Sequence, residues 1–180
     1  MSSAAATVAG MSEPLPSKIV MPDPNGPPAQ QRVATHTAEL MVPPEQAWLM
    51  ISDSAMVAAW YAFGGATVEP EPGGRFELSW QPGAVFQGRV ELADAPERLV
   101  YRLPQEPGVD LTGTNSTRVE LIVGPAEATG RSVITVTESG FGSLDDRYDA
   151  FEAFRSAQIA WIGAFGLLVQ ATGLPPTSPA

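Results

Sequence analysis

The sequence predicts an α+β domain in which a curved antiparallel sheet of about six or seven strands packs on one long C-terminal helix. Two observations lead to this prediction. The middle of the chain alternates short apolar runs with Gly and Pro turns, which is typical of a β-meander. The C-terminal part carries large apolar residues at helical spacing, and burying each one stabilises a fold by roughly 1.5–3 kcal/mol. These residues are Phe151, Phe154, Trp161, Phe165 and Leu168.

A strand and two short helices are expected first. Arg32–Val42 alternates loosely between polar and apolar residues, as in a strand with one solvated face. Pro43–Glu45 favours a helix start, because the N–H that proline lacks would have no partner in the first turn. Asp53 or Ser54 can cap a second helix that ends near Trp60–Tyr61.

Further strands follow, separated by turns rich in Gly and Pro. They are predicted at Ala66–Glu69, Arg75–Trp80, Val85–Leu92, Arg98–Leu103, Thr117–Val123 and Val133–Ser139. The long helix is predicted from about Leu144 to Gln170. Asp145 and Asp146 would then cap its first turn, where negative charge complements the helix dipole.

The length and composition indicate one domain between two tails. A chain of 180 residues can bury one core and is too short for two ordinary domains. Residues 1–31 are rich in Pro, Ala and Ser, so we expect a disordered tail there, with Met1 or Met11 as the start. The domain is predicted over residues 32–171, followed by a second disordered tail over 172–180.

Charge and residue types exclude several classes of function. Twenty acidic and ten basic residues give a net charge of -10, so we expect neither nucleic acid nor membranes as partners. The chain has no cysteine and one histidine, which predicts no metal site and no cofactor. No signal peptide or long apolar stretch is recognisable, so a cytoplasmic location is expected. A homodimer is compatible with the sequence.

Two candidates for chemistry stand out in the strands. His36 is predicted to be a surface or structural histidine, because no nucleophile motif accompanies it. Glu138 alternates with Ile134 and Val136. Its carboxyl either faces a cavity, where burial would raise its pKa and make it a candidate acid or base, or lies in water at a frayed strand end. Arg118 is expected to belong to an exposed cross-strand charge pattern, together with Glu120.

The aromatic residues form either an ordinary core or the walls of a ligand site. Tyr61 and Tyr101 add hydroxyls that can orient the polar end of a ligand. The candidate ligand-binding residues are Trp60, Tyr61, Phe76, Trp80, Phe86, Tyr101, Glu138, Phe141, Trp161 and Phe165. No catalytic residue is assigned, and Glu138 and Tyr101 are the candidates. We expect Trp161 and Phe165 to face the sheet residues Phe76, Trp80 and Tyr101.

Several short segments, in this order and spacing, carry a resemblance to a known family. They are Val42–Trp48, Trp60–Tyr61, Gly73–Phe76, Gly88–Val90, Ala95–Tyr101, Thr137–Phe141 and Ala160–Trp161. Over residues 32–170 the chain resembles the START-like helix-grip (SRPBCC) superfamily, in its branch of activators of heat-shock protein ATPase. The resemblance implies a helix-grip fold that encloses an apolar cavity. Leu92 and Leu103 replace a Glu and a Trp that are frequent in the family.

The resemblance implies three functions. The first is binding of a small hydrophobic or aromatic metabolite in a cavity between the sheet and the C-terminal helix. The second is a polyketide cyclase/aromatase-like enzyme that uses the same cavity, with Glu138 or Tyr101 moving protons. The third is a protein-interaction or stress-response module. Chaperone activation itself is not expected, because only a short Pro-rich segment precedes the fold where founding activators carry a further domain.

Overall fold

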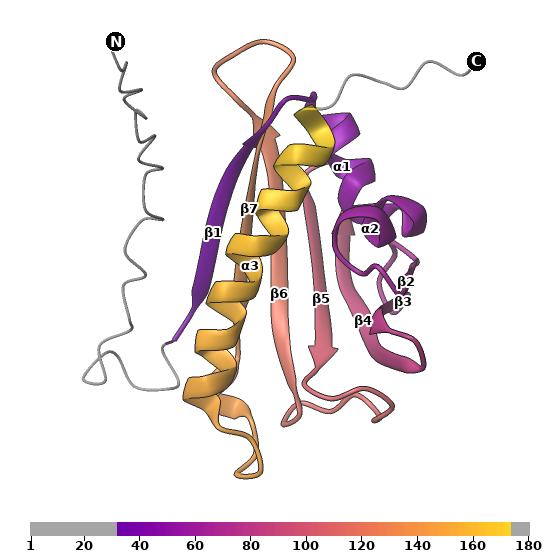
Figure 1. The fold of residues 1–180 in the computed structure, drawn as a ribbon, viewed down its shortest axis with the longest axis vertical. Coiled ribbons are helices and arrows are strands. Elements are labelled where there is room, and N and C mark those ends of the chain that lie inside the picture. Colours follow the sequence, from indigo (N-terminus) through magenta and orange to yellow (C-terminus); the bar gives the residue numbers. More distant parts are fainter. Residues whose placement is uncertain (1–31, 174–180) are drawn as a thin grey trace, which may run out of the picture.

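The computed structural model describes residues 32–173 and contains a seven-stranded antiparallel sheet in the order β1-β7-β6-β5-β4-β3-β2 (Figure 1). Both predicted tails lie outside the described residues, except for residues 172 and 173. The strands are β1 (Ala34–Leu40), β2 (Gly65–Val68), β3 (Arg75–Gln81), β4 (Ala84–Asp94), β5 (Arg98–Pro104), β6 (Ser116–Pro125) and β7 (Ser132–Ser139). The predicted helix-grip architecture is confirmed: the sheet curls around a long C-terminal helix, and two short helices follow the first strand.

The two short helices are α1 (Pro44–Ser52) and α2 (Ser54–Trp60). Pro44 occupies the first position of α1, as predicted. The Asp53 carboxylate caps α2 by accepting hydrogen bonds from the backbone N–H groups of Ala55 and Met56, both at 3.0 Å. The indole Nε1–H of Trp60 donates to the Met50 carbonyl at 2.7 Å, so the two helices are fixed against each other.

The long helix α3 spans Ala150–Gly173, so its predicted start at Leu144 was wrong. A short 3-10 turn, η2 (Phe141–Ser143), and a loop precede it. The carboxylate of Asp149 caps the helix by accepting from the N–H groups of Phe151 and Glu152, at 2.9 and 3.0 Å.

The predicted cap at Asp145 and Asp146 was wrong for a tertiary reason. The backbone N–H of Asp145 donates to the Thr114 carbonyl at 2.8 Å, which holds this segment against the loop between β5 and β6. The side chain of Asp145 pairs with Arg147 at 3.1 Å. Asp145, Asp146 and Asp149 are all residues that commonly cap helices. Because the contact with Thr114 holds Asp145 outside the helix, Asp149 is the residue that caps α3.

The two faces of the sheet differ in character. On β7 the buried residues alternate along the strand, and β6 repeats the pattern beside it. The helices α1, α2 and α3 cover this buried face (Figure 1). Gly88 lies where β4 runs close to β5: a Cβ there would lie 2.4 Å from the Arg102 carbonyl oxygen, so only glycine fits.

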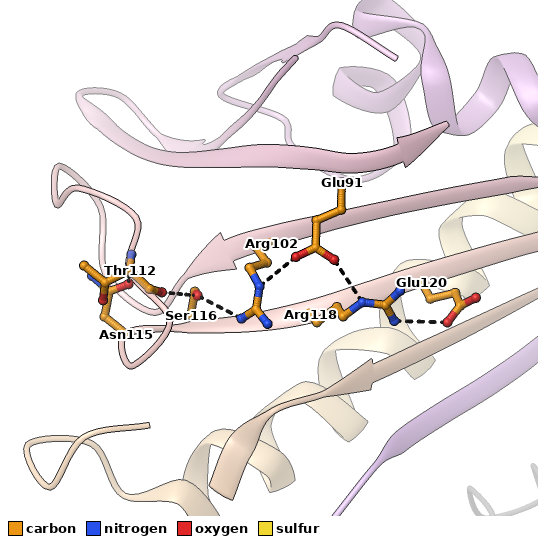
Figure 2. A network of polar contacts seen from close by, with 7 residues as sticks. All are labelled: Glu91, Arg102, Thr112, Asn115, Ser116, Arg118 and Glu120. Carbon is orange, nitrogen blue, oxygen red and sulfur yellow. Dashed lines mark hydrogen bonds and ion pairs between the residues drawn. The ribbon is translucent and has the colours of Figure 1, made fainter. Parts of the chain in front are cut away.

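The outer face carries a network of ion pairs that links three strands (Figure 2). A register irregularity in β4 lies at Glu91, whose carboxylate pairs with Arg102 at 2.8 Å and Arg118 at 2.9 Å. Arg118 also pairs with Glu120 at 3.2 Å, and Glu120 with Arg98. The predicted exposed charge pattern of Arg118 and Glu120 is confirmed.

The loop between β5 and β6 is held in a defined shape at the edge of this network (Figure 2). The Asn115 side chain accepts from the Thr112 N–H and donates to the Asp110 carbonyl, both at 2.8 Å. Arg102 lies 3.4 Å from the Ser116 hydroxyl and so connects the loop with the ion pairs. This loop forms one edge of the candidate site.

Candidate functional site

The strand register places two candidate residues in one row of the buried face. Tyr101 on β5 is opposite Val119 on β6, and Val119 is opposite Glu138 on β7. Strands are spaced by about 4.8 Å, so the backbones of Tyr101 and Glu138 lie about 10 Å apart with their side chains on the same side. Helix α3 crosses this face and brings Trp161 to the row.

Glu138 is buried, with 9% of its surface exposed, and both of its carboxylate oxygens accept hydrogen bonds. The Thr117 hydroxyl donates to Oε1 at 2.6 Å, and the indole Nε1–H of Trp161 donates to Oε2 at 2.7 Å. Burial raises the pKa of Glu138 above its ordinary value of 4.5, and the two hydrogen bonds oppose that shift in part. The reading of Glu138 as an exposed residue at a frayed strand end is therefore wrong.

Tyr61 and Tyr101 lie close enough to Glu138 for its charge to affect them. Burial raises the pKa of both hydroxyls, and the neighbouring carboxylate adds to the effect. The ring of Tyr61 is stacked between Trp60 and Trp161, with centroids at 5.1 and 5.2 Å. The two hydroxyls keep their protons at neutral pH and act as hydrogen-bond donors.

The hydroxyls of these tyrosines have no hydrogen-bond partner among residues 32–173. Tyr101 is only 1% exposed, and its ring lies 3.6 Å from that of Phe76, centroid to centroid. In the described part of the chain, every side-chain N or O that is sealed from water-sized space has a partner. The Tyr101 hydroxyl therefore touches space that a water molecule or a ligand atom can enter.

Two grooves lie along α3, and a third lies beside them at the hairpin between β3 and β4. The first, of about 470 Å³, includes Glu138 and is lined by Gln105, Glu106, Glu138, Tyr148, Asp149, Glu152, Ala153, Ser156, Ala157 and Ala160. The second, of about 310 Å³, is lined by Trp60, Tyr61, Phe63, Trp80, Ala160, Ala164 and Leu167. The third, of about 260 Å³, is lined by Trp80, Gln81, Ala84, Phe86 and Pro107. Ala160 is shared by the first two grooves and Trp80 by the last two, so the three grooves are neighbours.

The structure brings together most of the predicted site residues. Trp60, Tyr61, Tyr101, Glu138 and Trp161 form the centre described above. Trp80 and Phe86 contact each other at 5.1 Å between ring centroids, at the outer groove. Phe165 is fully buried and packs against Trp161 at 5.9 Å and against Trp60 at 6.4 Å.

Two predicted residues have other surroundings. Phe141 is buried against Phe154 near the start of α3, and the ring contacts of the described residues do not join this pair to the centre. His36 faces Phe165, with ring centroids at 5.4 Å, which confirms a structural position for this histidine. The residues 32–173 contain no group of three or more His, Cys, Asp or Glu side chains that could hold a metal ion.

Sequence analysis missed Thr117, the hydroxyl partner of Glu138. Its signal was present: Thr117 alternates with Val119 and Leu121 on β6, so it belongs to the buried face. A polar residue in a buried alternation needs a partner, and the neighbouring strand supplied a carboxyl.

A curled sheet that holds a long helix and keeps polar groups inside defines a helix-grip protein. This chain belongs to the family described as "Activator of Hsp90 ATPase homolog 1-like protein", whose family model matches residues 41–156. The resemblance stated from the sequence is thereby confirmed. No curated protein matches the chain significantly.

Solved structures share the fold. Protein MLL2253 from Mesorhizobium loti is 25% identical, with a TM-score of 0.62, over 77% of this chain and 95% of that one. The Aha1 dimer from Colwellia psychrerythraea is 11% identical, with a TM-score of 0.62, over 79% of this chain and 96% of that one. DynU16, from the dynemicin biosynthetic locus, is 18% identical, with a TM-score of 0.59, over 80% of this chain and 49% of that one.

In the described residues, no helix has both the length and the hydrophobicity needed to cross a membrane.

Proposed function

We propose that this protein binds a small hydrophobic or aromatic molecule in the grooves between α3 and the sheet. The observation that carries the proposal is a pair of tyrosine hydroxyls close to Glu138: neither the Tyr61 nor the Tyr101 hydroxyl has a partner among the described residues, and Tyr61 lines the second groove. Water can satisfy a hydroxyl that touches water-sized space, and a polar ligand atom that accepts the same hydrogen bond takes the place of that water.

The size and lining of the grooves support this proposal. Small-molecule sites are usually clefts of about 300–1,000 Å³, lined by aromatic and apolar side chains with a few polar groups. The second groove has this composition: Trp60, Trp80 and Leu167 are among its walls, and Tyr61 adds one hydroxyl. An aromatic ligand would stack on these rings and direct its polar atom toward the tyrosines.

The second candidate is an enzyme of the polyketide cyclase/aromatase type. It is favoured by Glu138, a buried carboxyl with a raised pKa that borders the first groove near two hydroxyl donors. A carboxyl with a raised pKa is a candidate proton donor or acceptor, and the grooves would hold a reactive chain in the geometry for ring closure. The biosynthetic locus of DynU16 is in keeping with this candidate.

The binding proposal is tested by filling the grooves. Ala160 lines both the first and the second groove, so Ala160→Phe should remove binding of an apolar fluorescent probe while the fold remains intact. Ala171→Phe makes the same change at an exposed position of α3 and serves as the control. Native mass spectrometry of the purified protein should show a co-purified small molecule that is absent from the Ala160→Phe variant. Unchanged probe affinity in that variant would refute the proposed site.

Glu138→Gln separates the two candidates. Gln keeps the shape and can still accept one hydrogen bond and donate another, but it cannot exchange a proton. A carrier should bind its ligand with similar affinity after this substitution. An enzyme should lose turnover, measured as cyclised product per binding site, while it retains binding.

We also propose that the protein acts in the cytoplasm. The dimer described for the Colwellia protein makes self-association a second property to test, by analytical ultracentrifugation of the full chain.

A further inference from the structure

The charged groups that line the first groove are all acidic. Glu106, Glu138, Asp149 and Glu152 contribute carboxyls to its wall, and neither Lys nor Arg is among its lining residues. The second groove adds no charged side chain. Any ligand that enters between α3 and the sheet therefore meets one sign of charge.

The nearest cations are already engaged. Arg155 pairs with Glu152 through two hydrogen bonds, at 2.9 and 3.1 Å. Arg147 pairs with Asp145 and lies over the Tyr148 ring at 4.7 Å, and Arg32 lies over the Phe151 ring at 4.7 Å.

The carboxylates of Glu106 and Asp149 have no cationic partner among residues 32–173. Glu106 accepts a hydrogen bond from the Tyr148 hydroxyl, and Asp149 caps α3. The arginines of β5 and β6 are paired on the opposite face of the sheet (Figure 2). Arg155 therefore offsets Glu152, whereas the negative charges of Glu106 and Asp149 have no cation among the described residues to offset them.

The two tyrosines close to Glu138, of which Tyr61 lines the second groove, have a complementary preference. The hydroxyls of Tyr61 and Tyr101 are donors without partners in the described residues, and Glu138 already has two donors of its own. A neutral oxygen, such as that of a ketone, can accept from the tyrosines without adding charge beside Glu138. An anionic group would accept as well, but it would lose its hydration next to carboxylates.

We propose that the site selects uncharged aromatic molecules that carry a carbonyl-type oxygen, and that it rejects carboxylates, phosphates and sulfonates of the same size. This inference rests on the proposed function, because it specifies which small molecules the same grooves accept.

The test uses two fluorescent probes with one ring system, a dimethylaminonaphthalene methyl ketone and the corresponding dimethylaminonaphthalene carboxylate. With the full chain at low salt and neutral pH, the ketone should bind at least about tenfold more tightly than the carboxylate. The difference should shrink at about 0.5 M NaCl, because salt screens the repulsion. In Glu106→Gln/Asp149→Asn it should also shrink, since Asn preserves the helix cap and both changes remove charge.

A second variant tests the hydrogen bond. Tyr101→Phe should weaken the ketone at least about threefold and bring it toward the affinity of the parent dimethylaminonaphthalene, which has no oxygen, while that parent probe binds as before. Ala171→Phe is again the control.

Three results would count against the inference. Equal affinity for the ketone and the carboxylate, or tighter binding of the carboxylate, would overturn the selectivity and leave the proposed binding function in place. An affinity for the ketone that Tyr101→Phe does not change would overturn the role of the hydroxyl. If neither probe binds and Ala160→Phe has no effect, the proposed function falls together with the inference.

Discussion

Glu138 and Glu120 lie on neighbouring strands of one sheet, yet the two carboxylates have opposite surroundings. Glu120 faces outward and pairs with Arg98 and Arg118. Glu138 faces the interior, where its oxygens accept from the neutral donors Thr117 and Trp161. On one face a carboxylate is balanced by charge, and on the other only by hydrogen bonds.

The comparison shows how the two faces of a single sheet can give the same type of side chain different properties. Surface ion pairs contribute about 0–1 kcal/mol and are screened by salt, so the outer network can change with little consequence. An interior carboxyl without a counter-charge keeps a raised pKa, which is a common property of functional groups. The alternation of side chains along β6 and β7 assigns each carboxylate to its face.

The largest expected effect comes from removing the interior donor. Trp161→Ala deletes a buried indole that stacks on Tyr61 and donates to Glu138, so unfolding should become easier by about 3–5 kcal/mol. Chemical denaturation measures this loss. Ile162→Ala, at a neighbouring residue that is 60% exposed, should cost less than about 1 kcal/mol. A loss of that small size in Trp161→Ala would show that the indole borders empty space rather than a packed core.

The next effect isolates the hydrogen bond from the ring. Trp161→Phe retains an aromatic ring but leaves Glu138 Oε2 without its donor, which should cost about 1–3 kcal/mol. Adding Glu138→Gln removes the buried charge and should recover part of that cost. A double-mutant cycle measures the coupling, and strict additivity would contradict a direct interaction.

The third prediction concerns pH. Because the pKa of Glu138 is raised in the folded state, the folded chain holds this proton more tightly than the unfolded chain does. The contribution of Glu138 to stability is fully present below its ordinary value of 4.5 and is lost as the pH rises toward the folded-state pKa. The difference in unfolding free energy between Glu138→Gln and the parent chain should therefore grow in favour of the variant over this range. A difference that is constant with pH would contradict the raised pKa.

The smallest effect is expected on the outer face. Glu91→Gln removes the pairs with Arg102 and Arg118, all of them partly exposed, and should cost about 0–1 kcal/mol. The cost should decrease at about 1 M salt, where the screening length is near 3 Å. A larger, salt-independent cost would mean that this face is as structurally demanding as the interior.

Much of this arrangement was predictable from local signals. The alternation on β7 and the proline at the start of α1 predicted the strand and the helix, and one of the two predicted caps of α2, Asp53, is the cap observed. The cap of α3 was not predictable, because Asp145 and Asp149 are the same residue type and the contact that holds Asp145 elsewhere comes from Thr114, a residue distant in sequence. The same limit, that long-range contacts are not visible in the sequence, applies to the residues of the site.

Glu138 was recognised as a candidate because it interrupts an apolar alternation. Its partners Thr117 and Trp161 come from another strand and from α3, so the register between β6 and β7 and the position of the helix had to be known first. Sequence patterns identified the face on which each side chain lies, and tertiary packing determined which side chains meet.

The ordered loop between β5 and β6 should affect how fast ligands bind to and leave the neighbouring groove. Asn115 and Ser116 fix its shape with hydrogen bonds to Asp110 and Thr112, of which the Thr112 contact is drawn in Figure 2. The Gly108 N–H also donates to the Val85 carbonyl of β4 at 2.9 Å. A rim that is ordered before a ligand arrives adds little entropy cost on association. Association rate constants should then be similar among ligands of like charge. Dissociation rate constants should differ according to how well each ligand packs against the aromatic residues of the groove.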